Sequence, residues 1–437
     1  LLSKEIKMYK NNIKRIILIS VCLVSLLGTI AASMIIPIFP ALFLNKASGL
    51  ILDNTINRKL MYSLAIACFP LAMLTATPIF GILSDIFEQY KTRLVLYGII
   101  FIMLSDVLSL AAVLLHNVWM FLLSRLICGF CVAEFPVSMS LISDISNDAQ
   151  ERKSNLKLLT ASMSVGSICG PLITIAILYL TRTNLSINVF ILTFATVIIF
   201  DLLSIIIFYY CSQTCKQPQL ITTPQQKITL NNLLHSILFM LKDPTAKIVV
   251  YAFIMYSFGA GLLMQGMPMY LAIEFNYSPK NLSFYTIAMA MSTIMGMYIL
   301  ESYVIHYFKN FMVILKTTIL VLSMMFISIS VLRGLNMQIQ LFKIGNFARE
   351  YQLWTISVIF YLVMSLSRIS FNELFASSVE PRRQSSAIAT MSQWINITGT
   401  LSGIMIGFLI EHKSLLLFSG ISLGISYVLL IRYKEFG

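Results

Sequence analysis

The sequence predicts an all-α polytopic membrane protein whose twelve transmembrane helices form two pseudo-symmetric six-helix bundles. Composition is the first reason. Of the 437 residues, 58% are hydrophobic and 11% are charged, whereas about a quarter of residues are charged in soluble proteins. Hydrophobic runs of about 20 residues, each long enough to cross about 30 Å of hydrocarbon, recur along the chain. The third reason is a repeat: Ile36-Pro37-Ile38-Phe39 is matched 231 residues later by Met267-Pro268-Met269-Tyr270.

Each hydrophobic run is expected to be one membrane-spanning helix. Unbroken runs of this length exclude a membrane β-barrel, whose strands are about ten residues of weak alternation. The first run is too long for a signal peptide and lacks a small-residue cleavage site, so we expect it to remain as a helix. The predicted spans are 16–44, 61–84, 94–115, 118–141, 157–180, 187–210, 247–273, 281–305, 311–333, 353–377, 386–410 and 414–432.

These spans predict four segments. Residues 1–15 form a short N-terminus, and residues 16–210 form the first six-helix bundle. The stretch 211–246 is rich in Gln, Pro and Thr and is expected to be a cytoplasmic linker. Residues 247–437 form the second bundle.

The net charge of +13 is distributed unevenly along the predicted topology. With the N-terminus in the cytoplasm, 20 of the 31 Lys and Arg residues fall on the cytoplasmic side, nine outside and two within spans. By the positive-inside rule, both termini are cytoplasmic in a multi-pass protein of the cytoplasmic (inner) membrane. The basic balance therefore indicates contact with lipid head groups and not with nucleic acid.

The repeat also indicates function. Proline-interrupted membrane helices at corresponding positions of two halves are typical of a secondary transporter's binding site. Candidate cavity residues near these prolines are Ser33, Pro37, Gln265 and Pro268. A second repeated element, Glu151-Arg152 in one half and Glu380-Pro381-Arg382-Arg383 in the other, recurs 229 to 230 residues apart.

Ionisable residues inside predicted spans are functional candidates, because a charge in hydrocarbon costs several kcal/mol unless it meets a partner or water. Asp106 and Glu134 are candidate proton carriers, and Arg125 is their candidate partner. For Asp201, a structural hydrogen bond is at least as good an explanation as a role in transport. Arg368 is expected either to pair with Glu134 or to meet an anionic ligand.

Several motifs resemble those of the major facilitator superfamily. Gly81-Ile-Leu-Ser-Asp85, followed by Lys91 and Arg93, resembles the charged loop between its second and third helices. The order and spacing of a longer set is similar to that of the tetracycline and multidrug proton antiporters: Trp119, Arg125, Gly129, Asp144-Ile145, Glu151-Arg152 and Gly166-x-x-x-Gly170-Pro171.

The resemblance implies roles for these residues. Gly81, Asp85, Lys91 and Arg93 would form a gating latch, Arg125 would assist proton transfer, and Asp106 lies near an acid of the tetracycline branch. Gly166, Gly170 and Pro171 would form the antiporter-type kink. The chain departs from the pattern at Ile86, Glu88 and Gln89, and at Gly28, where the tetracycline branch keeps an acid.

We therefore expect a monomeric, proton-coupled exporter of a small amphipathic compound or metabolite. The alternative is an importer or facilitator of a nutrient or metal-chelating metabolite on the same fold. A membrane enzyme is a third hypothesis, resting on Asp144-x-x-x-Asp148 alone. We expect no cofactor and no metal, because the pair Cys128-x-x-Cys131 has no second ligand pair nearby.

Overall fold

A computed structural model describes residues 2–45, 49–53, 55–86, 91–131, 134–181, 187–214, 241, 244–300, 311–339, 346–377 and 384–433. Within these residues, ten helices are long and apolar enough to cross a membrane. This confirms the predicted all-helical polytopic fold. The predicted linker beyond Thr214, the 380–383 loop and residues 87–90 lie outside the described residues.

Two of the predicted spans are each described as two helical pieces. In the range 118–141 these are α5 (Val118–Cys131) and α6 (Glu134–Ile145), and residues 132 and 133 between them lie outside the described residues. In the range 281–305, α11 (Pro279–Met295) passes directly into the π-helical turn η2 (Gly296–Leu300). Together with the ten long helices, these two pairs correspond to the twelve expected spans.

Contacts divide the chain into two compact units, one of residues 1–54 and 71–228 and the other of residues 55–70 and 229–437. Helix α3 (Arg58–Ile86) therefore contributes its first half to the second unit and its second half to the first. The predicted bundle boundaries at 210 and 247 remain a prediction.

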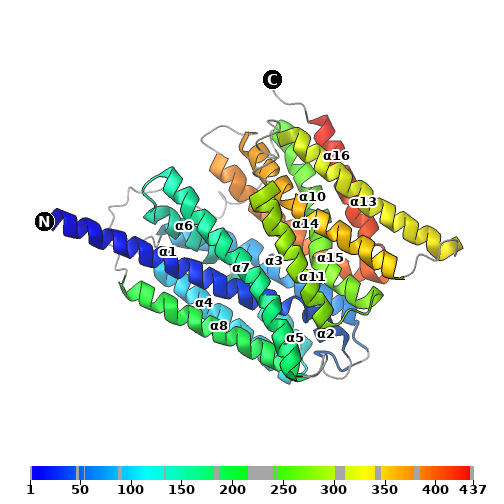
Figure 1. Cartoon of the computed structure of the whole chain (residues 1–437), viewed down its shortest axis with the longest axis horizontal. Coiled ribbons are helices and arrows are strands. Elements are labelled where there is room, and N and C mark those ends of the chain that lie inside the picture. The colour runs from blue at the N-terminus through cyan, green and yellow to red at the C-terminus, as the bar shows by residue number, and fades with distance from the viewer. Residues whose placement is uncertain are drawn as a thin grey trace. The chain divides into compact units, whose positions relative to one another are not determined.

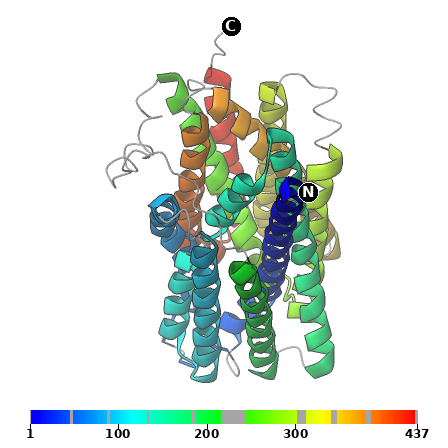
Figure 2. The ribbon, with the colours of Figure 1, turned by 90° about the vertical axis from the view of Figure 1, so that its left-hand side faces the viewer.

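The first unit is built around α1, which packs along α7 and α8, while α8 also packs along α4 (Figures 1 and 2). Its buried core includes Val95 and Ile99 of α4, Leu141 of α6 and Phe208 of α8. Besides α5, α6 and part of α3, its helices are α1 (Leu2–Ile35), α2 (Phe39–Leu44), α4 (Lys91–Leu114), α7 (Ala149–Thr181) and α8 (Ile187–Thr214).

The two repeated prolines have different structural effects. The helix predicted over 16–44 is interrupted: α1 ends at Ile35, a turn follows, and α2 begins at Phe39. Pro37 lies in this turn, where its missing N–H cannot continue the helical bonding. Pro268, in contrast, lies inside the continuous helix α10 (Pro244–Glu274).

The second unit contains α10, α11 and η2 with four long helices, α13 (Phe311–Ile339), α14 (Asn346–Ser377), α15 (Gln384–Glu411) and α16 (Leu415–Arg432). Helix α10 packs against α15 and α16, and α14 packs against α11 and α13 (Figure 1). Serine hydroxyls bind backbone carbonyls of neighbouring helices: Ser422 donates to Met255 over 2.8 Å and Ser426 to Ala252 over 2.7 Å. Such small polar residues allow close helix approach in membranes.

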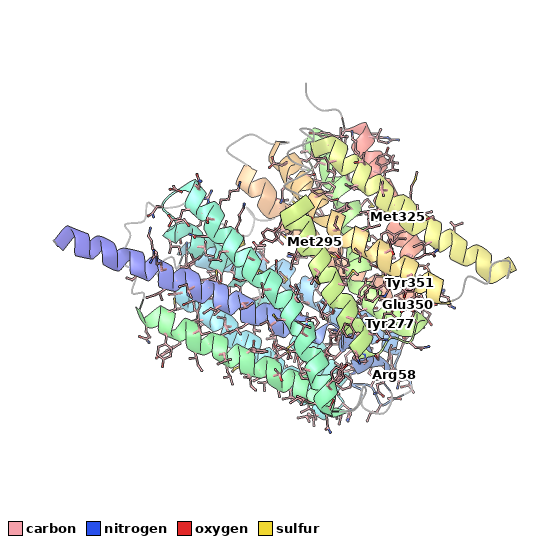
Figure 3. All side chains as sticks on the ribbon, in the orientation of Figure 1. Arg58, Tyr277, Met295, Met325, Glu350 and Tyr351 are labelled. Carbon is pink, nitrogen blue, oxygen red and sulfur yellow. The ribbon has the colours of Figure 1, made fainter. Side chains whose placement is uncertain are left out.

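Polar and aromatic side chains meet at one end of α14 in this unit. The hydroxyl of Tyr277 donates a hydrogen bond to Glu350, and the two residues lie side by side in Figure 3. Trp354 Nε1 donates to the Tyr277 hydroxyl over 2.7 Å. The Trp354 ring also packs edge-on against Tyr285, with 5.5 Å between ring centroids. The loop between α10 and α11 is therefore tied to α14.

Candidate functional site

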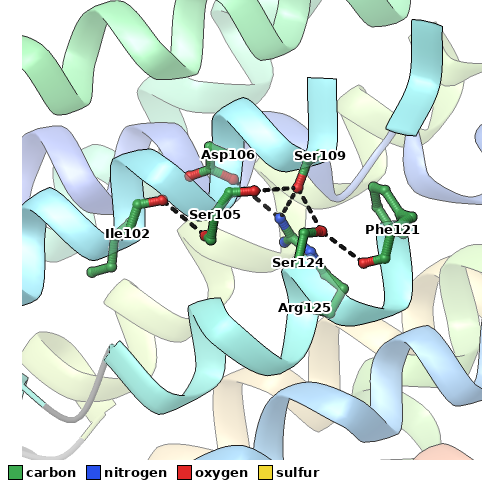
Figure 4. A network of polar contacts seen from close by, with 7 residues as sticks. All are labelled: Ile102, Ser105, Asp106, Ser109, Phe121, Ser124 and Arg125. Atoms are coloured by element: carbon green, nitrogen blue, oxygen red, sulfur yellow. Dashed lines mark hydrogen bonds and ion pairs between the residues drawn. The ribbon is translucent and has the colours of Figure 1, made fainter. Parts of the chain in front are cut away.

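An ion pair is buried between α4 and α5 of the first unit. Arg125 Nη2 lies 3.0 Å from Asp106 Oδ1 (Figure 4). Asp106 is 5% exposed and Arg125 is 9% exposed. Since α4 and α5 are consecutive helices packed along each other, two residues 19 positions apart are brought to the same depth. The structure thus brings together two of the three predicted proton-coupling residues.

Three serines surround this ion pair. Arg125 Nη2 also donates to the hydroxyl of Ser109 over 2.8 Å, and Ser109 lies 2.8 Å from the hydroxyl of Ser124 (Figure 4). Ser124 donates in turn to the carbonyl of Phe121. Ser105, one helical turn before Ser109, donates to the carbonyl of Ile102. Of the three hydroxyls, that of Ser109 binds the ion pair directly, and Ser124 extends this hydrogen-bonded network away from the pair.

A second carboxyl group lies near the first. Asp201 of α8 is 3% exposed, and its side chain is within interaction range of that of Asp106. The thiol of Cys128, one turn after Arg125 on α5, lies within electrostatic reach of Arg125, Asp106 and Asp201. Asp106, Asp201 and Arg125 thus form a buried cluster of two acidic side chains and one basic side chain.

Aromatic rings of α2 and α5 cover the guanidinium. Arg125 lies over the Phe121 ring, with 5.2 Å from Cζ to the ring centroid. Phe121 in turn packs against Phe39 and Phe43 of α2, both at 5.8 Å between centroids. The turn at Pro37 places α2 where its two phenylalanines reach Phe121. The proline repeat thus shapes the surroundings of the ion pair.

The predicted gating residues are described in part. Lys91 Nζ lies 2.7 Å from Asp144 Oδ2 of α6 and 3.0 Å from the Ser140 hydroxyl. Arg93, two residues later, is exposed. Gly81 and Asp85 lie in the last turns of α3, but their side-chain environment is outside the described part of the molecule, as is that of Glu134 at the start of α6.

The glycines of the predicted kink pack against α1. A Cβ atom on Gly170 would lie 2.0 Å from Ser33 Oγ and 2.6 Å from the Ile30 carbonyl. A Cβ on Gly166 would lie 2.8 Å from the Leu26 carbonyl. Pro171 lies inside α7, which runs from Ala149 to Thr181 as one helix. These glycines therefore permit close approach of α7 to α1.

The predicted cavity residues occupy separate environments. Ser33 is buried and donates to the Gly166 carbonyl over 3.1 Å. The Gln265 side chain accepts a hydrogen bond from Ser402 over 3.3 Å, and its backbone carbonyl accepts one from Tyr62 over 3.2 Å. Pro37 and Pro268 are buried, whereas Arg368 is exposed.

Sequence reasoning missed three features of the site. It did not pair Asp201 with Asp106, and it did not pair Lys91 with Asp144. It also named Glu151 only as part of a repeated acidic-basic element, although Glu151 closes the N-terminus of α7: its backbone N–H donates to Asp148 Oδ1 over 2.7 Å and its carboxylate accepts from the backbone N–H of Asn147. The spacing Asp148-x-x-Glu151 is a capping-box pattern and was a readable signal.

A family model of the major facilitator superfamily matches residues 21–403, most of the chain. The chain belongs to the major facilitator superfamily. This superfamily consists of transporters and not enzymes, so the membrane-enzyme hypothesis is wrong. The structure uses its two aspartates otherwise, Asp144 in the pair with Lys91 and Asp148 in the cap of α7.

Three solved structures of transporters have a similar fold. The human organic anion transporter MFSD10 (TETRAN) is 13% identical, with a TM-score of 0.65 over 95% of this chain and 99% of that one. A D-xylose–proton symporter is 14% identical, with a TM-score of 0.69 over 96% and 98% of the two chains. A POT family transporter in complex with 5-aminolevulinic acid is 12% identical, with a TM-score of 0.71 over 95% and 94%. No curated protein matches the chain in sequence.

Proposed function

We propose that this superfamily member is a proton-coupled exporter of a small amphipathic compound or metabolite, working by alternating access in the cytoplasmic membrane with both termini in the cytoplasm. The observation that carries the proposal is the buried cluster of Asp106, Asp201 and Arg125. Intramembrane ionisable residues that pair with one another are typical of proton relays.

The net charge of the cluster explains why it can bind a proton. With both carboxyl groups ionised, the two acids and one base carry one net negative charge. One shared proton makes the cluster neutral, and it converts the contact between Asp106 and Asp201 from a repulsion into a hydrogen bond. Burial of an uncompensated charge is costly, so the cluster favours the proton-bound form whenever water is excluded.

Coupling follows if water reaches the cluster in one transport state and not in another. In the closed state the proton stays between Asp106 and Asp201, with Arg125 held by Asp106 and Ser109. In a hydrated state the proton can leave, because water then stabilises the remaining charge. Glu134 remains a further candidate proton carrier, because it is an ionisable residue inside a predicted span.

An importer or facilitator is the second candidate. Gly28, at the position where the tetracycline branch keeps an acid, has open space around it: a Cβ there would meet nothing within 4 Å. One of the fold neighbours is named as a symporter, the D-xylose–proton symporter, and another as an organic anion transporter. At 13% and 14% identity these names describe those proteins and show only the shared fold.

The coupling site can be tested without knowing the substrate. Infrared difference spectra of the purified protein, recorded as the pH is stepped, report the stretch of protonated carboxyl groups. We expect a protonated-carboxyl band in the wild type that is lost in Asp201→Asn and in Asp106→Asn, and retained in Glu411→Gln, which changes an exposed acid at the end of α15. An unchanged band in both aspartate variants would remove the cluster from the mechanism.

The direction of transport is determined by a flux measurement. In everted vesicles that carry the protein, a transported compound should release protons from the vesicle lumen in the wild type and in Glu411→Gln, but not in Asp201→Asn. Accumulation of the compound in whole cells together with proton uptake would instead support import.

A further inference from the structure

The geometry points to a carboxylate-binding site inside the second unit, formed by Arg368 of α14, Tyr256 of α10 and Trp394 of α15. The site would hold the acidic group of an amphipathic organic anion. The inference names the substrate class and rests on the proposed transport function, but it uses residues that the proton-binding cluster does not contain.

Arg368 lies nine residues before the end of α14 at Ser377, well inside a helix expected to span the membrane, and its side chain is exposed. A guanidinium exposed to hydrocarbon at this depth would cost several kcal/mol, so the exposed face is expected to meet water or a ligand. Arg368 forms no ion pair with a carboxylate of the described residues. Among the described residues, the guanidinium therefore has no carboxylate as a counter-charge.

The face of α14 that carries Arg368 is turned toward α10. Phe371 and Phe375 follow Arg368 by three and seven residues and so lie on the same helix face. Their rings pack against Phe253 of α10, with 5.0 and 5.2 Å between centroids, and Phe371 also lies 5.1 Å from Tyr256. Tyr256 is 5% exposed and within electrostatic reach of the Arg368 guanidinium.

Trp394 brings a second donor from α15. Its Nε1 is buried and has no hydrogen-bond acceptor among the described residues. Trp394 lies ten residues after the start of α15 at Gln384, at about the depth of Arg368 on the preceding, antiparallel helix. It shares a helix face with Ser402, eight residues on, whose hydroxyl binds Gln265 of α10. The indole is therefore on the side of α15 that packs against α10.

The three side chains together offer donors for an anion. Guanidinium and indole N–H groups can only donate, and a tyrosine hydroxyl can donate. Glu373, five residues after Arg368, is the acid of these three helices that lies closest to Arg368 in the chain; it is exposed, and no ion pair joins it to Arg368. A carboxylate matches the planar guanidinium with two parallel hydrogen bonds, and the phenylalanines beside it suit an apolar body.

The test is binding of 1-naphthoate to the purified full-length protein by isothermal titration calorimetry, with 1-naphthalenemethanol as the uncharged partner and protein-free micelles as the blank. We expect saturable binding of naphthoate and at least tenfold weaker binding of the alcohol. Arg368→Gln should weaken naphthoate binding at least tenfold, which is the loss of one charge-assisted hydrogen-bonded pair. Trp394→Phe should weaken it by a smaller factor, and Arg432→Gln, at the end of α16, should not change it.

Folding is controlled by the elution profile and melting temperature of each variant, and Arg368→Lys keeps the charge if Arg368→Gln does not fold. Lysine should recover part of the affinity. Equal binding of acid and alcohol, naphthoate binding indifferent to Arg368, or displacement by chloride at equal concentration would each overturn the carboxylate site. Binding to the purified protein needs no proton gradient, so the Asp201→Asn variant should bind naphthoate with the affinity of the wild type. A failure of proton coupling is thus distinguishable from a failure of this site.

Discussion

Lys91 Nζ and Asp144 Oδ2 lie 2.7 Å apart, although 53 residues separate them in the chain. The lysine is the first residue of α4 and is 5% exposed, while the aspartate is in the last turns of α6. The side chain of Asp144 is 37% exposed, so the pair is buried on one side only. An ion pair thus ties the first turn of α4 to the last turns of α6 within the first unit.

We predict that this pair controls the rate of the transport cycle more than the stability of the fold. Asp144→Asn removes the partner of a buried ammonium group and should lower transport at least tenfold, with a loss of stability of about 1–3 kcal/mol. Flux in vesicles and thermal unfolding in detergent give the two quantities.

A charge exchange separates electrostatics from shape at this position. The double variant Lys91→Asp, Asp144→Lys should recover part of the flux lost in either single variant, because the two groups remain opposite in sign. Lys153→Gln, which changes an exposed lysine of α7, is the matched control and should change flux less than twofold. No recovery in the double variant would mean that the contact is only structural.

The acid–base cluster predicts that replacing Asp201 alone lowers stability much less than replacing Asp106 and Asp201 together. Asp201→Asn keeps the pair of Asp106 and Arg125, so the melting temperature should change by only a few degrees. Replacing Asp106 and Asp201 together leaves a buried guanidinium without a carboxylate partner, which typically costs about 3–5 kcal/mol. Thermal unfolding of the purified variants measures both, and equal destabilisation by the single and double changes would contradict the assigned pairing.

Gly170 and Gly28 make a matched pair for testing helix approach. Gly170→Ala inserts a methyl group 2.0 Å from Ser33 Oγ and 2.6 Å from the Ile30 carbonyl, so α7 must move away from α1. Overpacking of this kind costs about 1–3 kcal/mol. Gly28→Ala meets nothing within 4 Å and should not lower the melting temperature. Similar melting temperatures for the two variants would show that α7 and α1 are not tightly apposed.

The stability of the protein should depend on pH through Tyr277, which lies outside the predicted spans. Burial, followed by the hydrogen bond to Glu350, raises its pKa from 10 to about 12. The folded state therefore holds this proton more tightly than the unfolded state does. Stability from this contact should be complete below pH 10 and should fall as the pH rises from about 10 to about 12.

Trp354 reports this titration directly, because its Nε1 donates to the Tyr277 hydroxyl. In a Trp119→Phe, Trp394→Phe background, the remaining tryptophan fluorescence should be quenched with a midpoint near pH 12. The same titration of Tyr277→Phe should lack this step, and a midpoint near pH 10 would show that Tyr277 is not shielded.

The sequence alone determined the membrane class and the superfamily. Hydropathy is a sum over about 20 consecutive residues, so it can be read without knowing which helices are neighbours. For the same reason Asp106, Arg125 and Arg368 could be recognised as costly residues within predicted spans. The proline repeat could also be read from the sequence, but not that Pro37 would end α1 while Pro268 would leave α10 continuous.

Only the tertiary structure decided which of these residues meet. Asp201 lies near Asp106 because α8 packs along α4, and Lys91 meets Asp144 because α6 ends beside the start of α4. Gly170 serves close packing because one face of α7 lies on α1. These contacts depend on the rotation of each helix about its axis, which is set by the summed packing of all its neighbours. Nothing in a stretch of apolar sequence encodes that rotation by itself.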